Sequence, residues 1–259
     1  MDVLKRNLAP LTKEVWDEIE ERAAQVLKTN LSARKVVNVQ GPKGWDYNAL
    51  ATGRLTMIEG TNSGLYEVQP LVETRFTFEL DRWEMDNFIR GAKDIDLTSL
   101  EEAAKKIAEF EENAIYNGFP QGNIKGLMEV AETTISLGED VESILKGISQ
   151  GILKLRDAFE EGPYTLIVGE KVWNLVNQVV NGYPLKKIIE ELLGKEIVYS
   201  KYIDGALLLP FNHNDLELTI GHDFSIGYEW HDNKKVKLFI SESFTFRVLN
   251  NSIIVKYTA

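Results

Sequence analysis

Residues 96–118 read DLTSLEEAAKKIAEFEENAIYNG and contain the clearest helical pattern in the chain. Apolar side chains recur at the spacing of one helix face: Leu100, Ala103, Ala104, Ile107, Phe110, Ala114 and Ile115. Two overlapping Ser/Thr-x-x-Glu patterns each predict a capping box at the start: Thr98 with Glu101, and Ser99 with Glu102. Asn117-Gly118 supplies a left-handed stop. We predict an amphipathic helix of about five turns that serves as a structural spine.

The opposite face of this helix is charged, and we expect it to lie in solvent. It carries Glu101, Glu102, Lys105, Lys106, Glu109 and Glu112. The Glu109, Glu111 and Glu112 group lacks the Glu-x-x-His partner that a di-iron helical bundle uses. The prediction for these glutamates is therefore a solvated helix face without chemistry of its own.

Residues 68–80 alternate apolar and polar side chains over an unusual length. The even positions hold Val68, Pro70, Val72, Thr74, Phe76, Phe78 and Leu80, and Leu71 alone interrupts the alternation. A period of two predicts a strand with one apolar face. About fourteen residues would span roughly 45 Å, far above the usual strand length. With a hairpin expected around the turn at 62–64, the run predicts an arm that leaves its own domain and covers a neighbour.

The rest of the chain combines helix and strand patterns, which indicates an α+β protein. An N-terminal helix is expected after Thr12, with a stripe formed by Val15, Trp16, Ile19, Ala23, Val26 and Leu27. Such a stripe is either core packing or the wall of a groove for a peptide or a neighbouring subunit. Predicted helices within 138–162, 171–180 and 185–193 alternate with strands at 164–168, 197–202 and 206–209, which is typical of an α/β subdomain. From residue 216 onward the pattern is β.

The composition excludes several classes of function. A chain of 259 residues with 44% hydrophobic and 27% charged residues can bury a sizeable core, as one large domain or two small ones. Cysteine is absent, which excludes disulfides, thiolate nucleophiles and Cys-based metal sites. The net charge of −11 argues against sequence-independent binding of nucleic acid. The first ten residues lack the apolar segment of a signal peptide, and no apolar run reaches the length of a membrane span. We expect a cytoplasmic protein.

The sequence contains none of the common catalytic motifs. P-loop, GxGxxG, GxSxG and HExxH patterns are all missing. The three histidines, His213, His222 and His231, match no common metal-ligand spacing. We therefore predict no catalytic residue and no metal site, and the inventory favours a structural or assembling protein over an enzyme.

Several motifs, in chain order, resemble those of family 1 encapsulins. They are LKRNLAPLTKEVW, ARKVVNVQGPKGW, PLVETRFTFELDRWEMDN, the 96–118 helix, KGL at 125–127, EGPYTLIV, GYPL at 182–185, IGHDFSIGYE and FISESFTFRVLN. The resemblance covers nearly the whole chain. It implies the HK97-type fold of tailed-phage capsid proteins, in which many copies close into an icosahedral shell, here expected as a T=1 homo-oligomer of 60 subunits.

The resemblance also implies a division of the chain into domains. Residues 1–45 form the N-terminal helix and the start of a peripheral domain, and 46–74 form an extended loop. Residues 75–131 continue the peripheral domain with the spine helix. Residues 132–220 form a pore-lining axial domain, and 221–259 supply the remaining peripheral strands.

Encapsulins enclose cargo enzymes, so the resemblance implies partners as well as a fold. The cargo is a ferritin-like iron-oxidising protein or a dye-decolourising peroxidase, in the service of iron storage or oxidative-stress defence. A C-terminal cargo peptide docks between the N-terminal helix and the peripheral sheet. The matching positions here are Leu27, Asn30, Leu31, Arg34, Asn38, Asp223, Phe224 and Ile226. Asn38 departs from the family, whose members carry an acidic residue there, so a salt bridge to a cargo cation is in question at this position.

Two further sites follow from the resemblance alone. Some encapsulins stack a flavin, FMN or FAD, on a tryptophan that Trp83 matches, with Arg75 as a candidate phosphate or ring partner. The alternative for Trp83 is packing at a subunit contact. The segment Asn181, Gly182, Tyr183, Pro184 and Leu185 matches the loop that borders the five-fold pore, where ion passage is a hypothesis.

Two alternative functions remain open at this point. A tailed-phage or prophage major capsid protein would share the fold. However, the acidic net charge offers little for packaging a genome, and the encapsulin pattern begins at residue 4 with no long scaffolding segment expected before it. A secreted bacteriocin or protease would need a signal peptide or a nucleophile with its base, and neither is visible.

Overall fold

The structure is a computed structural model that describes residues 3–180 and 182–258. The chain forms two compact units, each built from three separate segments. The first unit contains Met1–Leu31, Gly41–Glu111 and Thr219–Thr245, and the second contains Ser32–Gln40, Glu112–Leu218 and Phe246–Ala259. Each unit combines helices with strands, so the predicted α+β class is confirmed.

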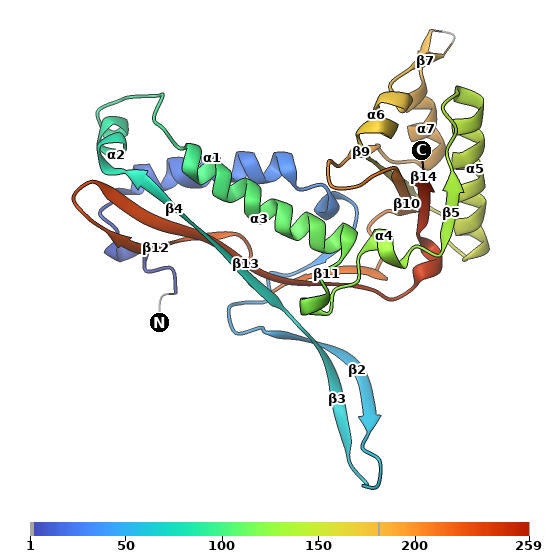
Figure 1. The fold of residues 1–259 in the computed structure, drawn as a ribbon, viewed down its shortest axis with the longest axis horizontal. Coiled ribbons are helices and arrows are strands. Elements are labelled where there is room, and N and C mark those ends of the chain that lie inside the picture. Colours follow the sequence, from blue (N-terminus) through green and yellow to red (C-terminus); the bar gives the residue numbers. More distant parts are fainter. Residues whose placement is uncertain (1–2, 181, 259) are drawn as a thin grey trace. The chain divides into compact units, whose positions relative to one another are not determined.

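The first unit is a sheet with two long helices packed against it (Figure 1). Helices α1 (Lys13–Asn30) and α3 (Thr98–Asn117) bury their apolar faces against strands β4 (Val72–Asp81), β12 (Ser225–His231) and β13 (Lys235–Val248). Strand β13 pairs antiparallel with β12 and, over ten residue pairs, with β4. Strand β1 (Asn38–Gln40) belongs to the second unit, and β11 (Leu216–Ile220) includes residues of both units. The long strand β13 is therefore the common partner in this sheet.

The predicted spine helix is confirmed as α3, and its predicted apolar face is buried apart from the half-buried Phe110. Its start differs from the predicted capping boxes. The Asp96 carboxylate accepts the Thr98 N–H at 2.9 Å, and hydrogen bonds from the Thr98 hydroxyl and N–H lower the pKa of Asp96. The Ser99 hydroxyl donates instead to the carbonyl of Glu79 on β4, at 2.6 Å. The Ser99 side chain therefore contacts β4 and does not cap the helix as predicted.

The predicted solvated face of α3 is wrong at two positions. Glu109 is exposed, as expected, but Glu111 and Glu112 are fully buried. A buried carboxylate needs hydrogen-bond donors, because its desolvation is costly. The spacing along the helix could not show these donors, since they lie far away in the sequence.

Glu112 joins α3 to the chain segment that follows α1, within the second unit. Its Oε1 atom accepts the backbone N–H groups of Ser32 and Ala33, both at 2.8 Å, and its Oε2 atom accepts the Ser32 hydroxyl. The hydroxyls of Ser32 and Tyr116 lie 2.8 Å apart. Burial, and then the charge of Glu112, raise the pKa of Tyr116 well above its usual range, so the phenol stays protonated. The carboxylate thus fixes the start of the short turn η2 (Ala33–Lys35).

The arm is a two-stranded antiparallel hairpin that projects from the sheet of the first unit (Figure 1). It consists of β2 (Ala49–Met57) and β3 (Gly64–Pro70). The predicted unbroken strand over 68–80 is wrong at Leu71, whose N–H donates to the carbonyl of Asn48 at 2.9 Å. There the pairing partner changes from β2 to β13. Six large apolar side chains of the arm are 48–76% exposed: Leu55, Met57, Ile58, Leu65, Tyr66 and Val68.

The base of the arm is fixed to the sheet by an aromatic stack. The rings of Trp45 and His222 are 3.8 Å apart between centroids and inclined by 12°. His222 Nε2 lies 3.3 Å from the Ser241 hydroxyl on β13, and burial lowers the pKa of His222. The imidazole is therefore neutral at neutral pH. The hairpin is therefore attached to the sheet at its base by the Trp45–His222 stack, while the apolar side chains farther along it are exposed.

The second unit is a five-stranded sheet accompanied by three helices. The strand order is β5 (Thr133–Ser136), β14 (Val255–Thr258), β10 (Ala206–Pro210), β6 (Tyr164–Val168) and β9 (Val198–Tyr199). The helices are α5 (Val141–Asp157), α6 (Glu170–Val176) and α7 (Leu185–Leu193). This confirms the predicted alternation of helix and strand. The predicted axial range, 132–220, lies in this unit except for its last two residues.

The remaining short elements connect the larger ones. They are η1 (Arg6–Leu8), α2 (Arg82–Ile89), η3 (Pro120–Gly122), α4 (Leu127–Val130), β7 (Val179–Val180), β8 (Tyr183–Pro184) and η4 (Asn251–Ile253). Strands β7 and β8 pair with each other as a small antiparallel hairpin.

We predict that Glu112→Ala lowers the free energy of unfolding by about 3 kcal/mol, because it leaves buried N–H groups without an acceptor. Glu112→Gln should lower the free energy of unfolding by less, since its amide oxygen can still accept the N–H groups of Ser32 and Ala33. Urea denaturation measures both. Glu102→Ala, at an exposed position of the same helix, is the control and should change stability by no more than about 0.5 kcal/mol. Equal effects at 112 and 102 would contradict the structural role of Glu112.

Candidate functional site

A groove in the first unit lies between α1 and the strands β12 and β13. It encloses a cavity of about 190 Å³. Its lining consists of Glu20, Ala23, Ala24, Leu27, Asp223, Phe224, Ile226 and Ile240. Two alanines on the helix side leave the space open, and the floor is aliphatic and aromatic. A cavity of this size is smaller than a typical small-molecule pocket and suits a single apolar side chain.

One edge of the groove is held by Arg6, which comes from the segment before α1. Its Nη1 atom lies 2.5 Å from Glu20 Oε1, and its Nε donates to the carbonyl of Ile226 at 2.6 Å. The guanidinium also lies 4.8 Å from the centre of the Trp16 ring. Arg6 therefore links β12 to α1 at this edge of the groove.

The predicted cargo-binding residues divide into three groups. Four line the cavity: Leu27, Asp223, Phe224 and Ile226. Asn30 and Leu31 follow at the end of α1, where the Asn30 amide donates to the Val26 carbonyl at 2.7 Å and Leu31 is buried in the core. Arg34 and Asn38 belong to the second unit, in which the Asn38 amide donates to Asn214 Oδ1 at 2.9 Å.

Sequence reasoning missed half of the cavity lining. The sequence pattern gives no site role to Glu20, Ala24 or Ile240, and it places Ala23 only in the apolar stripe of the N-terminal helix. The available signal was the adjacent alanine pair in α1, which marks the place where a helix leaves room for another group. Small residues carry no periodic signature of their own, so the pattern alone did not distinguish a groove from close core packing.

The predicted flavin residues lie apart on the first unit. Trp83 is the second residue of α2, its N–H donates to the Asp81 carboxylate at 2.7 Å, and its indole is 63% exposed. The guanidinium of Arg90 lies 5.6 Å from the centre of the Trp83 ring. Arg75 instead lies over the ring of Phe239, at 4.1 Å. Six strand residues separate Arg75 from the start of α2, roughly 20 Å, so one chain does not bring Arg75 to Trp83.

The predicted pore loop lies around the β7–β8 hairpin, and Asn181 falls outside the described residues. Gly182 has a φ of +81°, which glycine adopts without strain. The Tyr183 hydroxyl donates to Glu191 at 3.0 Å, and this bond to a carboxylate raises the pKa of Tyr183. Pro184 precedes α7, and Leu185 is its buried first residue.

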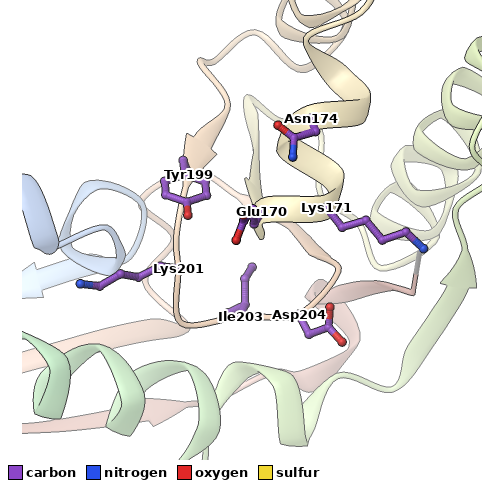
Figure 2. A pocket seen from close by; sticks show the side chains of 7 residues that line it. All are labelled: Glu170, Lys171, Asn174, Tyr199, Lys201, Ile203 and Asp204. Atoms are coloured by element: carbon purple, nitrogen blue, oxygen red, sulfur yellow. The ribbon is translucent and has the colours of Figure 1, made fainter.

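A second hollow, of about 470 Å³, lies in the second unit between α6 and the chain that follows β9 (Figure 2). Its lining is mostly polar: Glu170, Lys171, Asn174, Tyr199, Lys201, Ile203 and Asp204. Figure 2 shows the ammonium groups of Lys171 and Lys201 pointing away from each other, and Lys171 Nζ lies 3.6 Å from Glu139. Within the described part of the chain, no group of three or more His, Cys, Asp or Glu side chains is placed to hold a metal ion.

The fold is shared with capsid proteins. A virus-like particle protein from Pyrococcus furiosus matches with a TM-score of 0.72 over 93% of this chain and 98% of its own length, at 16% identity. The capsid of Myoviridae phage XM1 matches with a TM-score of 0.58 over 87% and 90%, at 10% identity. These likenesses show the HK97-type capsid fold, as predicted.

Comparison of sequences identifies one family among the proteins that share the capsid fold. The family described as "Encapsulating protein for peroxidase" matches residues 1–245. A type 1 encapsulin shell protein from Rhodospirillum rubrum is 37% identical over 262 residues, covering 96% of this chain and 94% of the relative. The chain belongs to the family of type 1 encapsulin shell proteins, which confirms the predicted resemblance. Among residues 3–180 and 182–258, none of the helices has the length and apolar character that crossing a membrane requires.

Proposed function

We propose that this chain is the subunit of a closed icosahedral shell, a T=1 particle of 60 copies, that encloses a guest enzyme. The exposed apolar arm carries this proposal. Six large apolar side chains exposed on one hairpin mark an interaction surface more often than a solvated one. A two-stranded hairpin is also only marginally stable by itself. Contact with a neighbouring copy would cover the arm and supply the missing packing.

The shell, in this proposal, has a structural role, and chemistry takes place in its guests. The relatives are named as shell proteins. Those names support an assembling function over an enzymatic one. The family description mentions a peroxidase, and a dye-decolourising peroxidase or a ferritin-like iron-oxidising protein is the proposed guest. The particle would then serve oxidative-stress defence or iron storage in the cytoplasm.

The groove beside α1 is the proposed docking place for the guest's C-terminal peptide. Its cavity offers an apolar side chain room among Leu27, Phe224 and Ile226, while Glu20 and Asp223 provide polar groups at its border. This arrangement matches recognition of a short peptide by an apolar pocket with a few polar anchors.

A flavin, FMN or FAD, is the proposed cofactor of the shell, on Trp83. The largely exposed indole offers a surface for stacking, and Arg90 beside it is a cation that could meet a phosphate or the ring edge. Arg75 would contribute only from a different copy, because it is distant from Trp83 in one chain. A bound flavin would supply electron transfer.

The alternative of a tailed-phage capsid protein is not favoured. The phage XM1 capsid shares the fold at 10% identity, whereas the Rhodospirillum rubrum type 1 encapsulin shell protein matches at 37% identity over 94% of its length. The capsid fold is common to both groups, so sequence identity, and not fold, separates them.

We predict that the purified protein has a mass in the megadalton range by multi-angle light scattering, because a closed shell contains many copies. The measurement should be made at neutral pH and moderate ionic strength. A stable monomer or dimer under these conditions would overturn the proposed shell.

For the groove, we predict that Ala24→Leu reduces guest capture by about tenfold or more, because the larger side chain fills the cavity while helix propensity is nearly unchanged. The readout is co-purification of a fluorescent protein that carries the C-terminal peptide of a type 1 encapsulin peroxidase guest. Gln25→Leu is the matched control, since it adds the same side chain to an exposed position of the same helix outside the cavity lining. Full capture by Ala24→Leu particles would contradict the proposed docking place.

For the cofactor, we predict that particles incubated with FMN or FAD keep the visible flavin absorption after desalting. Trp83→Ala should lose most of it, because the stacking surface is removed. Trp230→Ala, which deletes another partly exposed indole, serves as the control and should retain the flavin. Native particles that retain no flavin, or Trp83→Ala particles that retain as much as native, would rule out this site.

A further inference from the structure

Phe159 is the most exposed large apolar side chain among the described residues, at 93%. It lies two residues after the end of α5, in the second unit. A single exposed apolar residue needs no special explanation. The backbone conformation of Phe159, however, does need an explanation.

The backbone of Phe159 adopts a left-handed conformation, with φ at +68°. The Phe159 N–H donates to the carbonyl of Arg156 and the Glu160 N–H to the carbonyl of Leu155, both at 2.9 Å. These two bonds form a Schellman motif, which normally places glycine at this position because a Cβ atom crowds the backbone. The chain therefore presents a phenyl ring in a conformation that disfavours any side chain. Strain of this kind points to a function for the ring.

The residue after Phe159, Glu160, is fixed by two polar contacts. The Tyr164 hydroxyl donates to the carbonyl of Glu160 at 2.6 Å, and His213 Nε2 lies 3.2 Å from Glu160 Oε1. The ring is therefore displayed by an ordered loop, so little conformational freedom is lost when a partner covers it.

The surroundings of the ring contain both signs of charge. Phe159 borders a surface hollow of about 580 Å³ together with Arg156, Glu160 and Glu161. Neither Arg156 nor Glu161 forms an ion pair with another residue in the described parts of the chain. A patch with an apolar centre, an unpaired cation and an unpaired anion is complementary to a copy of itself.

We propose that Phe159 anchors a contact between two copies of this chain, with its ring inserted into the surface of the second copy and with Arg156 and Glu161 flanking it. This inference rests on the proposed shell, which requires lateral contacts between copies. It adds an interface in the second unit to the one formed by the arm of the first unit. Central aromatic residues dominate the binding energy of most protein interfaces.

Phe159→Gly separates the two roles of this position, because glycine removes the ring and also relieves the backbone. Assembly should require at least about tenfold more protein than for the native chain, as expected for loss of an interface anchor. The urea midpoint of the dissociated subunit should stay unchanged or rise, since glycine is preferred in this conformation. Light scattering across a concentration series measures assembly.

Two further variants control for the loop itself. Asn also tolerates the left-handed conformation, so Phe159→Asn should fold normally and assemble as poorly as Phe159→Gly. Phe159→Tyr keeps a ring and should assemble like the native chain. Native-like assembly of Phe159→Gly would overturn the inference and leave the shell intact. A lower urea midpoint for Phe159→Gly would also overturn it, because the ring would then act within one chain. Failure of the native chain to assemble would instead overturn the shell itself.

Discussion

A hairpin that cannot bury its own apolar side chains is the constraint on which this structure depends. Within the described residues, strands β2 and β3 pair only with each other, and most of the arm's large apolar side chains face water. Two strands do not form a core, so the arm has no stable environment within one chain. The stack of Trp45 on His222 attaches the base of the arm to the sheet. Burial against another copy resolves the conflict, because the partner supplies the apolar contacts that the hairpin lacks within one chain.

The first unit shows how one core can support two separate surfaces. Helix α1 packs on β12 and β13, which buries most of its apolar stripe, while the alanines at 23 and 24 leave the groove open at the edge of the same packing. Strand β13 also pairs with β4, which leads into the arm. The docking groove and the arm therefore share the sheet of one unit, although they face different partners in the proposed particle.

The sequence predicts regular elements better than the contacts between them. The spine helix and strand β6 follow from strong periodicity and from clear end signals, and both are present where expected. The burial of Glu112 could not be predicted, because its donors at 32 and 33 lie about eighty residues away and spacing along a helix carries no information about them. Leu71 is the one visible interruption of the apolar alternation, but the alternation resumes at the same even positions after it, so the pattern does not show that the pairing partner changes there. The left-handed backbone of Phe159 could not be predicted either, because phenylalanine gives no sequence signal for a conformation that glycine normally adopts.

Electron cryo-microscopy of the assembled protein tests the central claim most directly, because it shows the closure of the particle and the surroundings of the arm together. The account predicts a closed icosahedral shell in which residues 49–70 of each chain lie against a neighbouring copy, with Leu65 and Tyr66 buried at that contact. An arm that remains exposed in a closed particle, or particles that never close, would contradict it.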